Sequence, residues 1–192
     1  RKSRIKKVTI HPGDCKPLPD VLEAIRNADA IILGPGSLYT SIIPNLLVKD
    51  IPDAIRRSRA MKIYVANVMT QPGETQGYTV SDHIEAIREH GGDRLIEYVV
   101  VNNNFRVSKT LLQKYKDDGA EPVRYDVKKL REKGIVVVER DLMRASGELI
   151  RHSSDMLAKT IMELILNKRT GTEWMKGMEY YRTVSRLKKR DL

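Results

Sequence analysis

Short apolar runs alternate with helical stretches along the middle of the chain, and this alternation constrains the fold more than any other feature of the sequence. Ala30–Leu33, Lys62–Ala66 and Leu95–Val101 are runs rich in aliphatic residues. Apolar residues at helical spacing lie between them, as Ile84 and Ile87 do. This order is typical of α/β folds, so we expect a mainly parallel sheet.

Further elements follow from the same patterns. The alternation of apolar residues with lysines predicts a strand over Arg4–His11, and β-rich runs predict strands over Glu121–Tyr125 and Ile135–Glu139. The run Ala30–Leu33 has no polar alternation, so we expect it to be buried on both faces. Ser108–Lys116 is expected to be a helix, with Ser108 as its N-cap.

The net charge of +10 is concentrated at the two ends of the 192-residue chain. Residues 1–7 hold five basic and no acidic residues, residues 168–192 hold eight basic and three acidic, and residues 8–167 hold 22 of each. Nucleic-acid-binding proteins carry their basic face on the fold itself. We therefore expect no nucleic-acid partner, and we divide the chain into an α/β domain (1–167) and a basic amphipathic tail (168–192).

Other classes of protein are disfavoured by composition. The single cysteine, Cys15, excludes a disulfide framework or a multi-cysteine zinc site. No apolar run reaches the roughly 18 residues of a membrane span, and no apolar signal segment follows the basic start. His83 and His90 lack a carboxylate at ligand spacing, so we expect no metal. The sequence fits a cytoplasmic protein, and the missing initiator Met suggests a piece of a longer one.

The loop after Ala30–Leu33 is the first candidate site. It holds two glycines, Gly34 and Gly36, which allow close approach of the backbone to a ligand, and three hydroxyl side chains, Ser37, Thr40 and Ser41. Between a strand and a helix, such a loop suits a phosphate or a carboxylate. The alternative is an ordinary tight turn in which Ser37 caps the helix and Gly36 only supplies a positive φ.

Two more loops follow predicted strands. Residues 67–75 hold many hydrogen-bonding side chains around a Pro72-Gly73 turn, and Asn102-Asn103-Asn104 follow the third run. If the strands are parallel, all three loops meet at the carboxyl edge of the sheet, where α/β proteins bind ligands. Tyr115, read alone, fits the edge of a core, and Arg151 fits either an anion contact or a solvated position.

The sequence of the first two loops resembles the YvcK-type gluconeogenesis factors, in the superfamily of the 2-phospho-L-lactate transferase CofD. The resemblance rests on residues 32–47, on 67–75 and on Asp82-His83, and it covers about residues 4–167. The glycine-rich phosphate loop with which this family opens is absent. We therefore expect the chain to match the C-terminal half to two-thirds of a member, with residues 168–192 beyond the resemblance.

The resemblance implies a Rossmann-like fold with helices on both faces of the sheet, in three layers. It also implies a cytoplasmic bacterial regulator that binds UDP-N-acetylglucosamine without demonstrated turnover and is needed for growth and cell shape on gluconeogenic carbon sources. By position, Tyr115 and Arg151 match family residues implicated in UDP-sugar binding. A homo-oligomer and protein partners from cell-wall or kinase pathways are further expectations.

Two alternatives stay open. One is a CofD-like transferase, which moves a phospholactyl group from a guanosine diphosphate carrier to a deazaflavin and would require magnesium. The other is a nucleic-acid- or partner-binding module that uses the tail. No catalytic residue is assigned, and the expected ligand-binding residues are Gly34, Pro35, Gly36, Ser37, Thr40, Ser41, Asn67, Thr70, Gln71, Gly73, Glu74, Thr75, Asn102, Tyr115 and Arg151.

Overall fold

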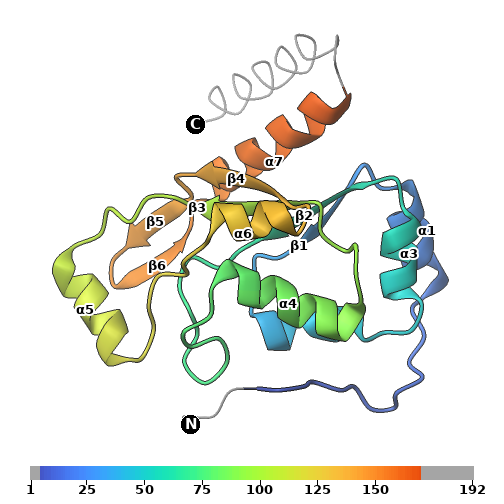
Figure 1. Ribbon diagram of the computed structural model, residues 1–192, viewed down its shortest axis with the longest axis horizontal. Helices are drawn as coiled ribbons and strands as arrows, with labels where there is room; N and C mark the ends of the chain where they lie inside the picture. The colour runs from blue at the N-terminus through green and yellow to red at the C-terminus, as the bar shows by residue number, and fades with distance from the viewer. Residues whose placement is uncertain (1–4, 170–192) are drawn as a thin grey trace, which may run out of the picture. The chain divides into compact units, whose positions relative to one another are not determined.

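A parallel four-stranded sheet forms the centre of the protein (Figure 1). The computed structural model describes residues 5–169, in two units that are treated separately, 5–153 and 154–169. The strands of the sheet stand in chain order: β1 (Ala30–Leu33), β2 (Met61–Val65), β3 (Tyr98–Asn102) and β4 (Val136–Arg140). All three strand pairs are parallel, with Ala30 opposite Met61, Ile63 opposite Tyr98, and Tyr98 opposite Val136. The predicted α/β class and parallel sheet are confirmed.

Helices connect the strands, and one more helix precedes β1. They are α1 (Pro19–Asn27), η1 (Leu38–Ile42), α2 (Ile43–Leu46), α3 (Ile51–Arg57), α4 (Val80–Gly91), α5 (Lys109–Asp117) and α6 (Val127–Glu132). Ser108 caps α5 as predicted, because its hydroxyl accepts a hydrogen bond from the Leu111 N–H. In Figure 1, α1 lies beside α3, and α2 beside α4 beneath the sheet. Right-handed crossovers between neighbouring parallel strands place their helices on one face of the sheet.

The hydrophobic core lies between this face of the sheet and the helices. Tyr64, Val99 and Val101 from the strands are fully buried there, together with Ile43 and Ile87 from the helices. The opposite faces of β2 and β3 are also buried, as the zero exposure of Ile63, Val65 and Val100 shows. The central strands are therefore covered on both sides, as a Rossmann-like fold requires.

β1 differs from the prediction that it is buried on both faces. It pairs only with β2 in the described sheet, and Ile32 on it is 41% exposed. A run of four apolar residues indicates a strand, but it does not distinguish a central strand from an edge strand.

Two predicted strands are wrong. Residues 5–10 have no regular secondary structure, although Ile5 and Val8 still pack against the core, and the Val8 N–H donates to His90 Nε2 at 3.0 Å. Residues 121–125 form only isolated bridges, Met69 with Pro122 and Thr79 with Arg124. Alternating apolar residues can therefore pack on a core without a neighbouring strand, and Pro122 has no N–H for a ladder.

A hairpin that the patterns did not predict follows β4. Its strands β5 (Met143–Ser146) and β6 (Leu149–His152) are antiparallel and joined at Gly147, which has a φ of +59°. The second unit contributes α7 (Ser154–Arg169), where apolar residues at helical spacing over Ser153–Leu166 predict a helix. The predicted tail, 168–192, lies outside the described residues except for Lys168 and Arg169.

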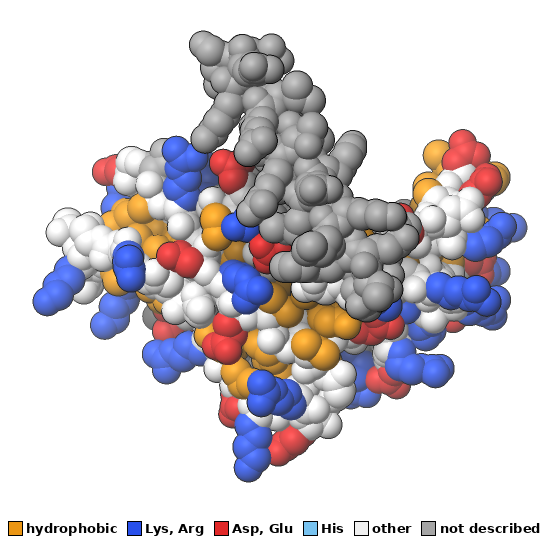
Figure 2. Space-filling model, turned by 90° about the horizontal axis from the view of Figure 1, so that it is seen from above, with side chains coloured by type: hydrophobic (Ala, Val, Ile, Leu, Met, Phe, Trp, Pro, Cys, Tyr) orange, Lys and Arg blue, Asp and Glu red, His pale blue; other side chains and the backbone are white. Residues whose placement is uncertain are grey.

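Two further observations concern the distribution of surface charge and the length and apolar character of the helices. On the face shown in Figure 2, Lys and Arg side chains are interspersed with Asp and Glu over the part that the structure describes. Within residues 5–169, no helix has both the length and the apolar character that crossing a membrane would require.

Candidate functional site

The loops after β1 and β2 meet at the carboxyl edge of the sheet, as predicted. Gln71 Nε2 donates a hydrogen bond of 2.7 Å to Ser37 Oγ, which joins the two loops directly. The loop after β3 joins them through apolar contacts, because Phe105 and Val107 pack against a cluster that includes Val68 and Met69. The three predicted segments therefore form one surface region.

The backbone conformation of the glycine loop after β1 depends on Gly34 more than on Gly36. Gly34 has a φ of +91°, and a Cβ there would lie 3.0 Å from the carbonyl oxygen of Val65. Gly36 does not have a left-handed φ, and its Cβ would meet only Ser41 Cβ, at 3.2 Å. The alternative in which Gly36 supplies a positive φ is wrong, since that conformation belongs to Gly34.

Ser37 begins the helical turn η1 but does not cap it with its side chain. Its carbonyl oxygen accepts from the N–H groups of Ser41 and Ile42, at 2.9 and 3.1 Å, while its hydroxyl is used by Gln71. Pro35, Thr40 and Ser41 are exposed beside it. The hydroxyl of Ser37 therefore positions the second loop, whereas those of Thr40 and Ser41 face solvent.

The loop 67–75 is held by its threonines. Thr70 Oγ1 accepts from the Glu121 N–H at 2.9 Å, and Thr75 Oγ1 accepts from the Gln71 N–H at 2.9 Å. Both threonines are buried, with 2% and 0% of their surface exposed. A turn over 71–75, with Gly73 at a φ of +78°, completes the loop. Thr70 and Thr75 thus stabilise the loop from inside it.

Three other side chains of this loop carry buried oxygens that have no hydrogen-bond partner: Asn67 Oδ1, Gln71 Oε1 and Glu74 Oε2. Most buried polar atoms in native proteins are paired, so unpaired ones require an explanation. They lie on the loop at the carboxyl edge of the sheet, so their lone pairs are available to a hydrogen-bond donor there.

Asn102 lies at the end of β3 and connects two segments. Its Oδ1 accepts from the Leu142 N–H at 2.9 Å, and its Nδ2 donates to the Asn104 carbonyl oxygen at 2.6 Å. The side chain is buried and both of its polar atoms are engaged. Asn102 therefore fixes the start of the segment that leads to the β5–β6 hairpin.

The hairpin lies against the end of β2, which places Arg151 at the same edge. His152 Nε2 is 3.1 Å from the Ala66 carbonyl oxygen, and Ile150 packs on Val68 and Met69. The Tyr115 hydroxyl accepts from the Ile150 N–H at 2.9 Å. Since side chains alternate along a strand, the exposed Arg151 lies on the other face of the hairpin from Ile150 and His152.

Sequence patterns missed Arg144, which stands directly opposite Arg151 across the hairpin. Both arginines are exposed, and neither forms an ion pair with another residue in the range 5–169. Like charges opposite each other on a ribbon are destabilising unless an anion lies near them. Only the strand pairing, which no local pattern indicated, brings the two together.

The two histidines considered for a metal have separate structural roles. His83 is fully buried, and its Nδ1 lies 2.8 Å from the Tyr64 hydroxyl. Burial lowers the pKa of His83 to about 4, so the ring is neutral at pH 7. His90 accepts from the Val8 N–H through Nε2 and donates through Nδ1 to the Ala86 carbonyl oxygen at 2.7 Å.

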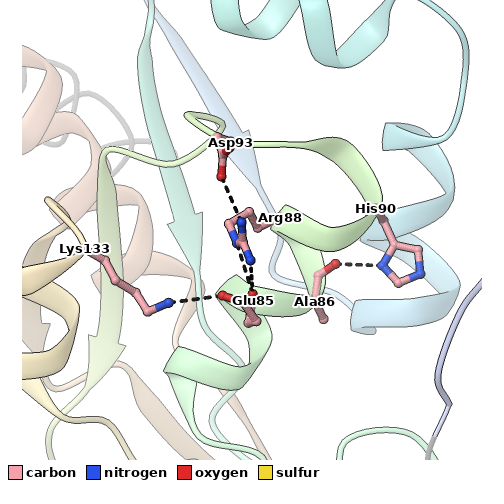
Figure 3. A network of polar contacts seen from close by, with 6 residues as sticks. All are labelled: Glu85, Ala86, Arg88, His90, Asp93 and Lys133. Atoms are coloured by element: carbon pink, nitrogen blue, oxygen red, sulfur yellow. Dashed lines mark hydrogen bonds and ion pairs between the residues drawn. The ribbon is translucent and has the colours of Figure 1, made fainter.

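A hollow at the opposite, amino edge of the sheet contains a network of charges (Figure 3). Glu85 accepts from Arg88 and, at 3.1 Å, from Lys133, while Asp93 lies 3.4 Å from Arg88. These hydrogen bonds lower the pKa of the Glu85 carboxyl to about 2. The cations are matched by carboxylates, so the network ties α4 to the segments before β3 and β4.

Comparison with known proteins identifies the family and the fold of the chain. The sequence profile of the family described as 2-phospho-L-lactate transferase CofD matches residues 1–143. A crystal structure of a UPF0052-family protein from Bacillus halodurans is similar to the chain, with a TM-score of 0.79 and 44% identity, over 82% of this chain and 51% of that one. The fold and the sequence thus define a Rossmann-like α/β protein, and the chain belongs to the CofD family.

Its relatives within that family include gluconeogenesis factors. The chain is 40% identical to the gluconeogenesis factor of Bacillus subtilis, over 84% of this chain and 51% of that protein. A Clostridium acetobutylicum relative is 43% identical over 97% of this chain and 41% of its own length. The similarity to this relative therefore extends into residues 168–192, whereas the family profile ends at residue 143 and the Bacillus subtilis relative matches 84% of the chain. The chain spans about half the length of the relatives that it matches.

Proposed function

We propose that the chain is the part of a gluconeogenesis factor that binds a nucleotide sugar, UDP-N-acetylglucosamine, at the carboxyl edge of its sheet. The observation that carries the proposal is the Gln71–Ser37 hydrogen bond. It joins the loops after β1 and β2, which carry the resemblance to the family, into one site. The ligand class is the one that the resemblance to the YvcK-type gluconeogenesis factors implies. The protein would act as a cytoplasmic regulator, without turnover of the sugar, in growth and cell shape on gluconeogenic carbon sources.

The hairpin offers a place for the diphosphate on the face opposite to the one that packs on Val68 and Met69. Arg144 and Arg151 present two unpaired guanidinium groups on one face, and guanidinium groups bind phosphate oxygens through charge-assisted hydrogen bonds. Tyr115 contributes by holding Ile150, the neighbour of Arg151. Its proposed role in binding is therefore to position the hairpin.

Titration calorimetry of the natural protein with UDP-N-acetylglucosamine tests this function. We expect saturable binding that Arg151→Ala weakens by at least about tenfold, or about 1.4 kcal/mol. Lys128→Ala, which removes an exposed cation from α6, serves as the control and should bind normally. Absence of heat and of any thermal shift with millimolar ligand would refute the proposal.

The description of the matched family favours a second candidate, a phospholactyl transferase. Among residues 5–169, no group of three His, Cys, Asp or Glu side chains is placed to hold a metal ion. We therefore derive no metal-assisted step. Product formation from a guanylyl-phospholactate donor and a deazaflavin acceptor would establish this candidate.

A further inference from the structure

The unpaired oxygens of the loop 67–75 indicate which part of the ligand this loop binds. Glu74 gives the clearest information, because an ionised carboxylate has only acceptor atoms, whereas an amide can present either an acceptor or a donor. Its Oε2 is buried and has no partner. The turn 71–75 holds the backbone of Glu74 in place, since its N–H donates to the Gln71 carbonyl oxygen at 3.1 Å.

The charge around Glu74 determines what can approach it. No Lys, Arg or His within residues 5–169 forms an ion pair with this carboxylate. A phosphate placed beside it would meet a like charge in a partly buried setting, where repulsion is weakly screened. The ligand group that faces Glu74 must therefore carry no negative charge.

A hydroxyl group fits this position better than a metal ion. Glu74 is the only carboxylate on the loop 67–75, and its potential co-ligands are two amides. A magnesium ion on Glu74 would be held together with phosphate oxygens of the ligand, which would bring the diphosphate to this loop and away from the arginine pair of the hairpin. Sugar hydroxyls need only an acceptor at hydrogen-bond distance, and Asn67 and Gln71 offer further polar atoms beside Glu74.

We infer that Glu74 accepts hydrogen bonds from sugar hydroxyls of the ligand, so that the loop 67–75 binds the sugar and not the phosphates. This inference rests on the proposed function, since it assigns one part of the nucleotide sugar to one loop. Two sources of the hydroxyls share this chemistry, the ribose and the hexose.

The experiment combines a change in the protein with a change in the ligand, which isolates one contact. Binding of UDP-N-acetylglucosamine, UDP and 2′-deoxy-UDP is measured by calorimetry for the natural protein, for Glu74→Gln and for the exposed control Glu132→Gln. We expect Glu74→Gln to weaken UDP-N-acetylglucosamine at least about tenfold. Glu132→Gln should bind like wild type.

The ligand series identifies the hydroxyls. If they belong to the hexose, UDP binds both proteins equally. If they belong to the ribose, UDP loses affinity in Glu74→Gln and 2′-deoxy-UDP does not. Removal of the hydroxyl must also weaken binding to the wild-type protein. If wild type binds UDP-N-acetylglucosamine, UDP and 2′-deoxy-UDP with equal affinity, no such hydroxyl contributes, and the inference is overturned even if Glu74→Gln fails to fold.

Three further results would count against the inference, and they are distinguishable. If the wild-type protein binds the ligand and Glu74→Gln binds it equally well or more tightly, the inference is overturned and the proposed function stands. Tighter binding would mean that a phosphate faces the carboxylate. If binding requires Mg²⁺ and Glu74→Gln removes this requirement, Glu74 binds a cation. That result also overturns the inference. Absence of wild-type binding overturns the proposed function, and the inference with it.

Discussion

Gln71 and Ser37 lie 34 residues apart in the chain, yet the side-chain amide of one donates to the hydroxyl of the other at 2.7 Å. This hydrogen bond is the direct polar contact between the loop after β1 and the loop after β2. It also occupies the Ser37 hydroxyl, which would otherwise be free to cap η1. Each loop therefore limits the conformations of the other.

Replacing either partner of this bond should loosen both loops. Ser37→Ala is expected to lower the free energy of unfolding by about 1 kcal/mol, the usual net worth of one hydrogen bond. Gln71→Ala in the Ser37→Ala background should cost less than it does alone. Urea denaturation of the four proteins measures this coupling, with the exposed Ser41→Ala as control. Additive effects of the two changes would show that the bond contributes nothing.

The two glycines of the first loop should respond differently to substitution. Gly34→Ala places a Cβ against the Val65 carbonyl oxygen in a left-handed conformation, so it should destabilise the fold by more than about 1 kcal/mol. Gly36→Val should stay folded by circular dichroism and lose at least about tenfold in affinity for UDP-N-acetylglucosamine. Equal stability losses for Gly34→Ala and Gly36→Ala would contradict this assignment.

Asn102 should matter for stability because both of its polar atoms are engaged. Asn102→Ala leaves the N–H of the fully buried Leu142 without an acceptor, which should cost about 1–3 kcal/mol. The neighbouring Asn103 has an exposed side chain, so Asn103→Ala should change stability by less than about 0.5 kcal/mol. Chemical denaturation distinguishes the two variants. A loss for Asn103→Ala as large as that for Asn102→Ala would refute this account.

Stability should fall in mild acid because of His83. Burial lowers its pKa from 6.5 to about 4, so between these values the unfolded chain binds a proton that the folded chain does not. The stabilisation is therefore complete above pH 6.5 and is lost as the pH falls toward 4, by about 3 kcal/mol in all.

His83→Asn keeps a polar group near the Tyr64 hydroxyl but does not titrate, so unfolding measured from pH 7 to pH 4 should show a reduced slope. Some slope remains, because burial also lowers the pKa of His152. A slope in His83→Asn as steep as in wild type would assign the acid sensitivity to other groups.

The sequence was sufficient for the four strands of the parallel sheet and for the meeting of the loops after β1 and β2. Continuous apolar runs and helical spacing depend on local burial, so they identified β2, β3, β4 and α4 to within a few residues. The convergence of the first two loops followed from parallel pairing alone. The family that the resemblance indicated is confirmed by the matching family profile, and the ligand class that it implies stays a prediction.

What the sequence could not indicate depends on tertiary contacts. The β5–β6 hairpin has only Gly147 as a local signal, and its place against Ala66 depends on His152, 86 residues away. The sequence also did not indicate that Thr70, Thr75 and Glu74 have different roles in the loop. All three are polar loop residues, and only burial and pairing separate those that hold the loop from the one with an unpaired oxygen.

The order of the strands has a consequence for how the sheet is made during synthesis. β1 to β4 stand in the sheet in the order in which they leave the ribosome, and each pairs with the strand before it. The pairings Ala30–Met61, Ile63–Tyr98 and Tyr98–Val136 each close a loop of fewer than forty residues. Each new strand therefore meets an edge that is already formed, so that edge is covered soon after it forms and is exposed to other nascent chains only briefly.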